Sequence, residues 1–228
     1  MKPAAITLTA KDHEQISKAV EQAELQSAGE IVTILAERSD GYTDVALIWS
    51  LGIALVALGA LTAFPEFYMG LYDRMLADWG HEWTPRTILA LAAMVFVLKF
   101  AGVYLIQLWQ PLKFAVIPGP VKSARVHDRA VRAFRIGAEQ RTTGRTGVLI
   151  YLSMREHRAE IVADEAIASK VDPKVWGDAM QAMLVHVREG RVADGMCAAI
   201  EQVGAIVAPH FPRADDDINE LPDRLIEV

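Results

Sequence analysis

The chain has one cysteine, Cys197, among its 228 residues. A single cysteine cannot form an intramolecular disulfide, and such a composition suits a reducing compartment. The sequence also has no P-loop, no glycine-rich dinucleotide fingerprint and no Cys/His cluster with metal-ligand spacing. Its net charge of -6 gives no general reason to expect a nucleic-acid partner. These absences argue against nucleotide-dependent enzymes, zinc modules and nucleic-acid-binding proteins.

Charge is nearly absent from two long stretches. Val45 to Phe64 holds 20 residues without a charged side chain, and Thr87 to Trp109 holds 23 residues with one charge, Lys99. At a rise of about 1.5 Å per residue, either helix is long enough to cross a hydrocarbon core of about 30 Å. We therefore predict a transmembrane helical hairpin over residues 45–109, with spans 45–64 and 87–109 and an external loop 65–86.

Basic residues follow the second stretch at close intervals. They are Lys113, Lys122, Arg125, Arg129, Arg132 and Arg135. Lysine and arginine near the ends of a span favour the cytoplasmic side. We predict a multi-pass protein of the cell (inner) membrane with both termini and the soluble domain in the cytoplasm. Attraction to anionic lipid would follow for the basic helix face of Lys122, Arg125, Arg129 and Arg132.

The remaining residues alternate between helical and strand patterns. Thr9 and Asp12 resemble a capping box that opens a helix to about Gln26, and Asp172 before Pro173 marks another helix start. The predicted helices span about 10–26, 121–141, 172–190 and 196–208, and the predicted strands span 30–36, 147–152 and 158–163. The fold class is α/β, in the order α-β-[hairpin]-α-β-β-α-α. The domain comprises residues 1–44 and 110–210, followed by a tail, 211–228, that we expect to be irregular.

Several segments together resemble the TPM domain family, also named TPM phosphatase. They are the Ala28-Gly-Glu-Ile-Val strand, the run Arg145-Thr-Gly-Val-Leu-Ile-Tyr-Leu-Ser, the run Glu156-His-Arg-Ala-Glu-Ile-Val-Ala-Asp-Glu-Ala-Ile, and Arg188-Glu-Gly-Arg-Val-Ala-Asp-Gly. The chain looks most like the bacterial branch in which a transmembrane hairpin follows the first strand. The resemblance implies a compact α/β fold and, for some relatives, phosphatase activity, cation binding or a role in maintaining membrane complexes.

One feature of the family is altered here. Many relatives carry an acidic Asp-Asn-Gly turn before the second strand, where this chain has Arg145-Thr146-Gly147. The carboxylate that the resemblance would assign to a cation is therefore missing at this turn.

Asp164 and Glu165, which follow the third predicted strand, are the candidate metal ligands, with Glu30 or Glu139 as a further carboxylate. Carboxylates of this kind can hold a divalent cation such as calcium or magnesium, or act as acid and base. Helix capping and turn solvation are the structural alternatives. Arg145 is a candidate for binding a phosphate or carboxylate, or for pairing with Asp164 or Glu165. Cys197 lies in an apolar helical pattern, which favours core packing over a reactive thiolate.

Lys99 is the thirteenth of the 23 residues in its span. A lysine near the centre of a span costs roughly 2.5–3.5 kcal/mol on insertion scales. It either extends toward the cytoplasmic headgroups or faces a partner span or a second copy of the chain.

Two function classes follow from these observations. The first is an integral membrane accessory protein whose cytoplasmic TPM-like domain binds a protein partner, in the assembly or maintenance of a membrane complex. In this class the protein has no catalytic residues and no cofactor, and its partners are the lipid bilayer and a membrane protein or another copy. The alternative is a membrane-anchored phosphatase that depends on a divalent cation. The sequence favours the first.

Overall fold

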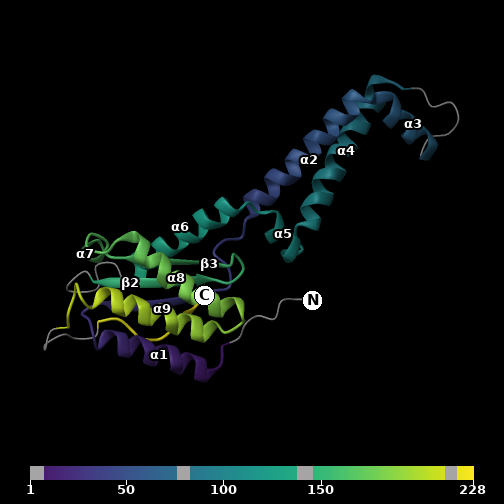
Figure 1. Ribbon diagram of the computed structural model, residues 1–228. Helices are drawn as coiled ribbons and strands as arrows, with labels where there is room; N and C mark the ends of the chain where they lie inside the picture. Colours follow the sequence, from purple (N-terminus) through teal and green to yellow (C-terminus); the bar gives the residue numbers. More distant parts are fainter. Residues whose placement is uncertain (1–7, 76–82, 138–145, 214–219) are drawn as a thin grey trace. The chain divides into compact units, whose positions relative to one another are not determined.

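The computed structural model describes residues 8–75, 83–137, 146–213 and 220–228 (Figure 1). The chain divides into two compact units, Met1–Asp40 with Pro118–Val228, and Gly41–Ile117. We call them the α/β unit and the helical unit.

The α/β unit contains helices on both sides of a sheet. Its helices are α1 (Ala10–Glu24), α6 (Gly119–Gly137), α7 (Glu165–Ala168), α8 (Pro173–Arg188) and α9 (Val192–Val207), and its strands are β1 (Glu30–Ala36), β2 (Gly147–Ser153), β3 (Arg158–Ala163) and β4 (Ile226–Glu227). The strand order among the described residues is β3-β2-β1-β4. β1 pairs in parallel with β2 and β4, whereas β2 and β3 are antiparallel. Because parallel neighbours need a crossover, α6 connects β1 to β2, and the helical unit is inserted into this connection.

Alternate residues of the central strands enter two cores. Ile31 and Leu35 of β1 pack with α1, α8 and α9 on one face of the sheet. Val32 and Ile34 pack with Val126, Ala130 and Phe134 of α6 on the other face. Every residue of β1 and β2 is buried. Burial on both faces explains why these two strands are nearly continuous apolar runs in the sequence.

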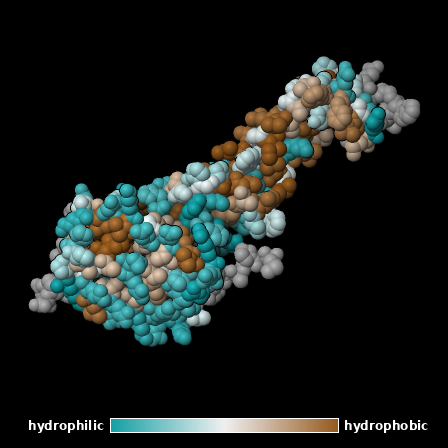
Figure 2. Space-filling view, viewed as in Figure 1, coloured by the Kyte–Doolittle hydropathy of each residue, from teal (hydrophilic) through white to brown (hydrophobic). Residues whose placement is uncertain are grey.

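The helical unit contains α2 (Thr43–Ala63), α3 (Pro65–Met75), α4 (Pro85–Ile106) and α5 (Gln110–Val116). α2 and α4 pack against each other, and α2 buries Ala46, Ser50, Ala54 and Leu61 along one stripe. Both helices are long and apolar enough to cross a membrane, and only 6% of the most apolar window of α4 is buried. A core helix of a soluble protein would be mostly buried. Hydrophobic residues accordingly cover the visible surface of this pair (Figure 2).

In the helical unit, aromatic side chains pack together where α2 begins and α5 lies beside it. Tyr42, the residue before α2, is fully buried in the left-handed conformation at φ 50°, and its ring meets Phe114 edge-on with centroids 5.5 Å apart. Lys113 donates to the carbonyl oxygen of Gly41. Gly41 and Tyr42, which precede α2, are thus held against α5, the helix that follows α4.

Most predicted elements are observed with small shifts of their ends. β1 and β3 have the predicted bounds, and the capping box of Thr9 and Asp12 and the N-cap of Asp172 are present. The sequence interpretation did not predict α5, after the second apolar stretch, or α7, after β3, and α3 lies within the predicted loop 65–86. The predicted tail is not irregular throughout. Its residues 226–227 form β4, which extends the sheet beside β1.

Candidate functional site

Three buried carboxylates lie where β1 and β2 begin. Glu24 accepts the N–H of Ile31 at 2.8 Å, Glu30 accepts the N–H of Leu221 at 3.1 Å, and Asp164 accepts the N–H of Gly147 at 3.1 Å. Their exposed fractions are 9%, 6% and 6%. Glu30 and Gly147 are paired across β1 and β2, and Asp164 also donates its N–H to Gly147. Each carboxylate thus accepts a main-chain hydrogen bond.

Among these three carboxylates, Glu24 has a raised pKa, and burial is the main cause. The pKa of Glu24 is raised to about 8, mainly by burial and to a smaller extent by the nearby carboxylates Glu30 and Asp223. The N–H of Ile31 and the charge of Arg213 act in the opposite direction. Glu24 therefore holds its proton near neutral pH, and a neutral carboxylic acid is a poor ligand for a cation.

The predicted metal ligands do not converge. Asp164 is buried against the Gly147 main chain, whereas Glu165 begins α7 with an exposed side chain. In the part of the chain that the structure describes, no group of three or more His, Cys, Asp or Glu side chains is arranged to hold a metal ion. Among the described residues, Asp164 and Glu165 therefore do not form the cation site that the family resemblance implies. Arg145 and Glu139 lie outside the described residues.

A second polar cluster lies where β1 and β2 end, and we call it the hydroxyl cluster: Ser39, Tyr151, Ser153 and Glu156. Ser39 Oγ donates to Ser153 Oγ at 2.9 Å, and Ser153 Oγ donates to Glu156 Oε2 at 2.5 Å. The Tyr151 hydroxyl lies 3.1 Å from Ser39 Oγ, and the N–H of Ser39 donates to Glu156 Oε1 at 3.0 Å. Burial raises the pKa of Tyr151, opposed by hydrogen bonds from Ser39 and Arg129.

The position of the hydroxyl cluster is one where α/β proteins commonly bind ligands, since it lies beyond the carboxyl ends of parallel strands. The burial of its members argues for a structural role. Ser153, the hydroxyl that donates directly to Glu156, is fully buried and Glu156 is 4% exposed. The hydroxyl of Ser39 is more accessible, but it donates its hydrogen bond to the hydroxyl of Ser153, which is not a base. A serine nucleophile needs a base within direct hydrogen-bond reach. The hydrogen bonds of the hydroxyl cluster therefore hold the ends of β1 and β2 together, and we call this arrangement the clamp.

Further contacts strengthen this clamp. Arg155 pairs with Glu37 at 2.9 Å, and Arg125 of α6 pairs with Asp40 at 3.3 Å. The N–H groups of Met154 and Arg155 donate to the carbonyls of Ala36 and Glu37. The segment 37–40, which leads out of β1, is therefore fixed to the turn after β2.

The amino-acid sequence of this α/β unit matches a known family. Residues 117–206 match the family described as the TPM domain. This match covers less than half of the chain and lies almost entirely within the α/β unit, which we call the TPM domain from here on. The NMR structure of the BA42 protein from the psychrophilic bacterium Bizionia argentinensis has a similar fold, with a TM-score of 0.56 and 19% identity over 100% of both chains. At that identity the likeness concerns the fold alone. No curated protein matches the sequence.

The predicted basic face of α6 is partly engaged within the TPM domain. Arg125 pairs with Asp40, and Arg129 lies close enough to hydrogen-bond Tyr151. Arg132 is exposed and donates to the carbonyl of Asp128 in its own helix. Lys122 is partly exposed. Contact of this face with lipid stays a prediction.

Cys197 lies in the core of the TPM domain. It is 9% exposed on α9, and its thiol lies 3.8 Å from the carbonyl oxygen of Gln15 in α1. Burial raises the pKa of the thiol. Because a reactive cysteine needs a lowered pKa and access to its substrate, this residue packs the core, as its helical pattern predicted.

Gln107 and Lys99, two polar residues of the helical unit, differ in their exposure to solvent. Gln107 is 5% exposed, and its amide donates to the carbonyl of Ala46 at 3.2 Å, which fastens the end of α4 to the start of α2. Lys99, in contrast, has an exposed side chain on α4. It is therefore available to headgroups or to a partner and does not pack inside the pair.

The hydroxyl cluster is the feature that the sequence interpretation missed. Its signal was present, since polar residues follow the ends of two strands that both read as buried. Recognising the pairing of β1 with β2 as parallel would have placed Ser39 beside Ser153 and Glu156.

Proposed function

We propose that this protein is an integral membrane accessory protein whose cytoplasmic TPM domain binds a protein partner, in the assembly or maintenance of a membrane complex. The observation that carries the proposal is the exposure of α2 and α4. Ile48 and Val56 of α2 and Leu89 of α4 are 69%, 72% and 70% exposed. An apolar surface of this extent is costly in water and favourable in a lipid bilayer.

The hydrogen bonds of the buried polar groups favour a partner-binding role over a phosphatase role. Glu24, Glu30 and Asp164 accept main-chain N–H groups, and the hydroxyl cluster is buried and self-paired. Groups used in this way stabilise a fold, since a buried polar group needs a hydrogen-bond partner. The insertion of the apolar helices into the β1–β2 crossover would hold such a domain beside a membrane complex.

The cytoplasmic side is supported by charge. Lys113 and the basic residues of α6 follow α4 closely, and positive residues near the ends of spans stay on the cytoplasmic side.

Membrane insertion and orientation can be tested by matched cysteine variants of the full chain. Glu66→Cys places an exposed thiol on α3, and Glu21→Cys places one on α1, while Cys197 is buried and poorly reactive. The protein should resist extraction by alkaline carbonate. A membrane-impermeant maleimide added to intact cells with a permeable outer envelope should label Glu66→Cys alone, and Glu21→Cys only after lysis. Release by carbonate, or the reverse labelling, would contradict the proposal.

The phosphatase alternative can be tested by melting the full chain in detergent with and without millimolar calcium, magnesium or manganese. A ligand that binds only the folded state raises its stability. We expect no metal-dependent shift of Tm. A shift that disappears in the double variant Asp164→Asn, Glu165→Gln would instead establish a cation site and support the phosphatase.

A further inference from the structure

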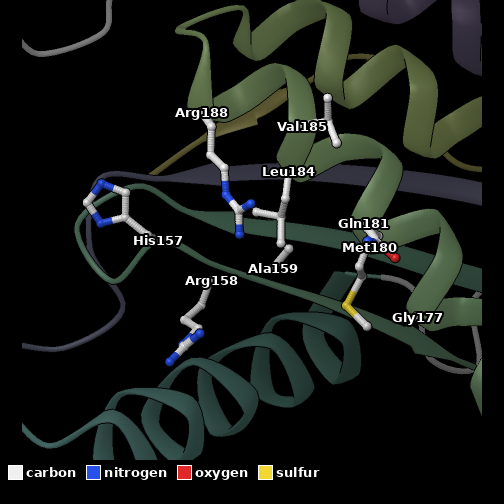
Figure 3. Close-up of a pocket in the computed structure, with 9 residues that line it drawn as sticks. All are labelled: His157, Arg158, Ala159, Gly177, Met180, Gln181, Leu184, Val185 and Arg188. Carbon is white, nitrogen blue, oxygen red and sulfur yellow. The ribbon is translucent and has the colours of Figure 1, made fainter.

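A groove on the TPM domain lies between α8 and β3. It has a volume of about 380 Å³ (Figure 3). Ala159, Met180, Leu184 and Val185 supply its apolar lining, and Arg188 supplies positive charge. His157 and Arg188 lie toward one end of the groove and Gly177 lies at the other, while the Arg158 side chain points away from Arg188 toward α6, where its guanidinium lies near Gly119 (Figure 3). The groove is therefore basic at one end and apolar along its length.

The apolar lining of the groove is a second face of α8. The core face of this helix is Trp176, Ala179 and Met183. The groove residues Gly177, Met180, Leu184 and Arg188 recur at the spacing of a helical stripe, and Val185 beside them is 50% exposed. Hydrophobic side chains on a second face of a helix have no role in its own core, and such a face is typical of a binding surface.

The other wall of the groove is an open sheet edge. β3 is the outermost strand of the sheet, beside β2. Asp164 donates its N–H to the carbonyl of Gly147, which lies opposite it. Since antiparallel pairs alternate, the main-chain groups of Glu160 and Val162 also face β2, and those of Ala159, Ile161 and Ala163 face outward. No described residue forms a main-chain hydrogen bond with these outward groups.

The charge of the groove determines which partner it suits. No carboxylate lines it, although the chain as a whole carries a net charge of -6. Arg188 forms no ion pair with another described residue. An arginine fork binds carboxylates with two parallel hydrogen bonds, so Arg188 complements aspartate or glutamate. At the same end, His157 holds the left-handed conformation at φ 51° in the turn between β2 and β3.

From these observations we infer that the groove binds an extended segment of a partner protein. The segment adds to the sheet along the outward edge of β3, inserts apolar side chains against Met180, Leu184 and Val185, and presents a carboxylate to Arg188. Main-chain pairing supplies affinity in such strand addition, and the pockets for alternate side chains supply specificity. The inference rests on the proposed partner-binding function and names the surface and the chemistry of the partner.

The inference can be tested with a random 12-residue peptide library selected on the full chain in neutral-lipid nanodiscs. The charge reversal Arg188→Glu is selected in parallel, and Lys174→Glu, exposed on α8 outside the groove, is the matched control. Wild type and the control should enrich peptides with Asp or Glu next to alternating β-branched residues. The reversed variant should bind these peptides at least about tenfold more weakly and enrich Lys- or Arg-bearing peptides. N-methylation of alternate main-chain nitrogens in an enriched peptide should abolish binding, because it removes strand pairing.

The outcomes separate this inference from the function on which it rests. Enriched peptides that bind wild type and the reversed variant equally would overturn the groove and leave partner binding in place. A library without enriched peptides would count against both. Loss of acidic-peptide binding in anionic-lipid nanodiscs, regained in neutral ones, would assign the groove to lipid headgroups and overturn the inference.

Discussion

At the scale of single residues, the buried polar groups of the TPM domain either stabilise or weaken it according to their partners. Burial disfavours the ionised form of Glu24, and its pKa is raised to about 8. Thr33 is 1% exposed in β1, and its hydroxyl has no hydrogen-bond partner among the described residues. Ser153 is fully buried and uses its hydroxyl in two hydrogen bonds.

Glu24 should make stability depend on pH. A carboxyl whose pKa is raised on folding binds its proton more tightly in the folded state. Its contribution is complete below its ordinary pKa of 4.5 and is lost as pH rises to about 8. The free energy of unfolding should therefore fall across this window, by at most about 1.4 kcal/mol per pH unit. Glu24→Gln should flatten the fall, as measured by denaturation of the full chain in detergent. Glu21→Gln, at an exposed position of the same helix, should keep the slope, and an equal slope in both variants would contradict the role of Glu24.

Thr33→Val should stabilise the domain by about 1 kcal/mol. The substitution keeps the shape of the side chain and removes an unpaired buried hydroxyl. Ser153→Ala should instead destabilise it by about 1–3 kcal/mol, because it leaves the partners Ser39 and Glu156 without their hydrogen bonds. In denaturant unfolding, the two variants should change the free energy of unfolding in opposite directions if the hydrogen bonds are assigned correctly. A loss of stability in Thr33→Val would show that its hydroxyl has a partner.

At the scale of elements, the close approach of helices depends on two glycines of α9. A Cβ at Gly195 would lie 2.8 Å from the carbonyl oxygen of Met183 in α8, and one at Gly204 would lie 2.9 Å from the Cβ of Ala23 in α1. These distances are too short for a carbon atom. The small residues therefore determine how closely α8 and α1 pack on α9.

Gly195→Ala should destabilise the TPM domain by about 1–3 kcal/mol, since backbone and not a flexible side chain would have to move. Gly177→Ala, in α8 with no atom within 4 Å of the added Cβ, should stabilise it by about 0.5–1 kcal/mol through helix propensity. Thermal unfolding of the two variants distinguishes a packing effect from a propensity effect. Equal stabilisation by both would mean that α8 and α9 are not packed as closely as described.

At the scale of the whole molecule, one domain is divided in sequence by a helical unit of different composition. The hydroxyl cluster and the ion pairs of Arg155 and Arg125 fix the segment where the chain leaves β1. Tyr42, Phe114 and Gln107 fix the base of the helical unit. Each unit therefore has its own packing, and the insertion does not interrupt the sheet.

Lys99→Leu should weaken assembly with a partner span without impairing insertion. The side chain is exposed on α4, and replacing it removes a charge that costs roughly 2.5–3.5 kcal/mol at mid-membrane. The measurement compares cross-linked complexes in native membranes for wild type, Lys99→Leu and the charge-conserving Lys99→Arg. Unchanged cross-linking in Lys99→Leu would leave extension toward the headgroups as the role of this lysine.

The sequence by itself determined most of the helices and strands and the resemblance to the TPM domain. The β-branched run of 30–36, the alternation of 158–163 and the cap at Asp172 specify local structure, because propensity and periodicity act over a few neighbouring residues. The resemblance to the TPM domain was confirmed over 117–206, and the two apolar runs became the two helices that are long enough to cross a membrane.

Only the tertiary structure decided what the polar residues do. Asp164 and Glu165 are adjacent in sequence, but one is buried on the main chain of Gly147 and the other is exposed. Ser39 and Ser153 are far apart in sequence and meet because β1 and β2 are parallel. The β4 strand of two residues is too short for any periodic signal and exists because β1 offers it an edge. Pairing and burial depend on distant segments of the chain, so local sequence patterns do not specify them.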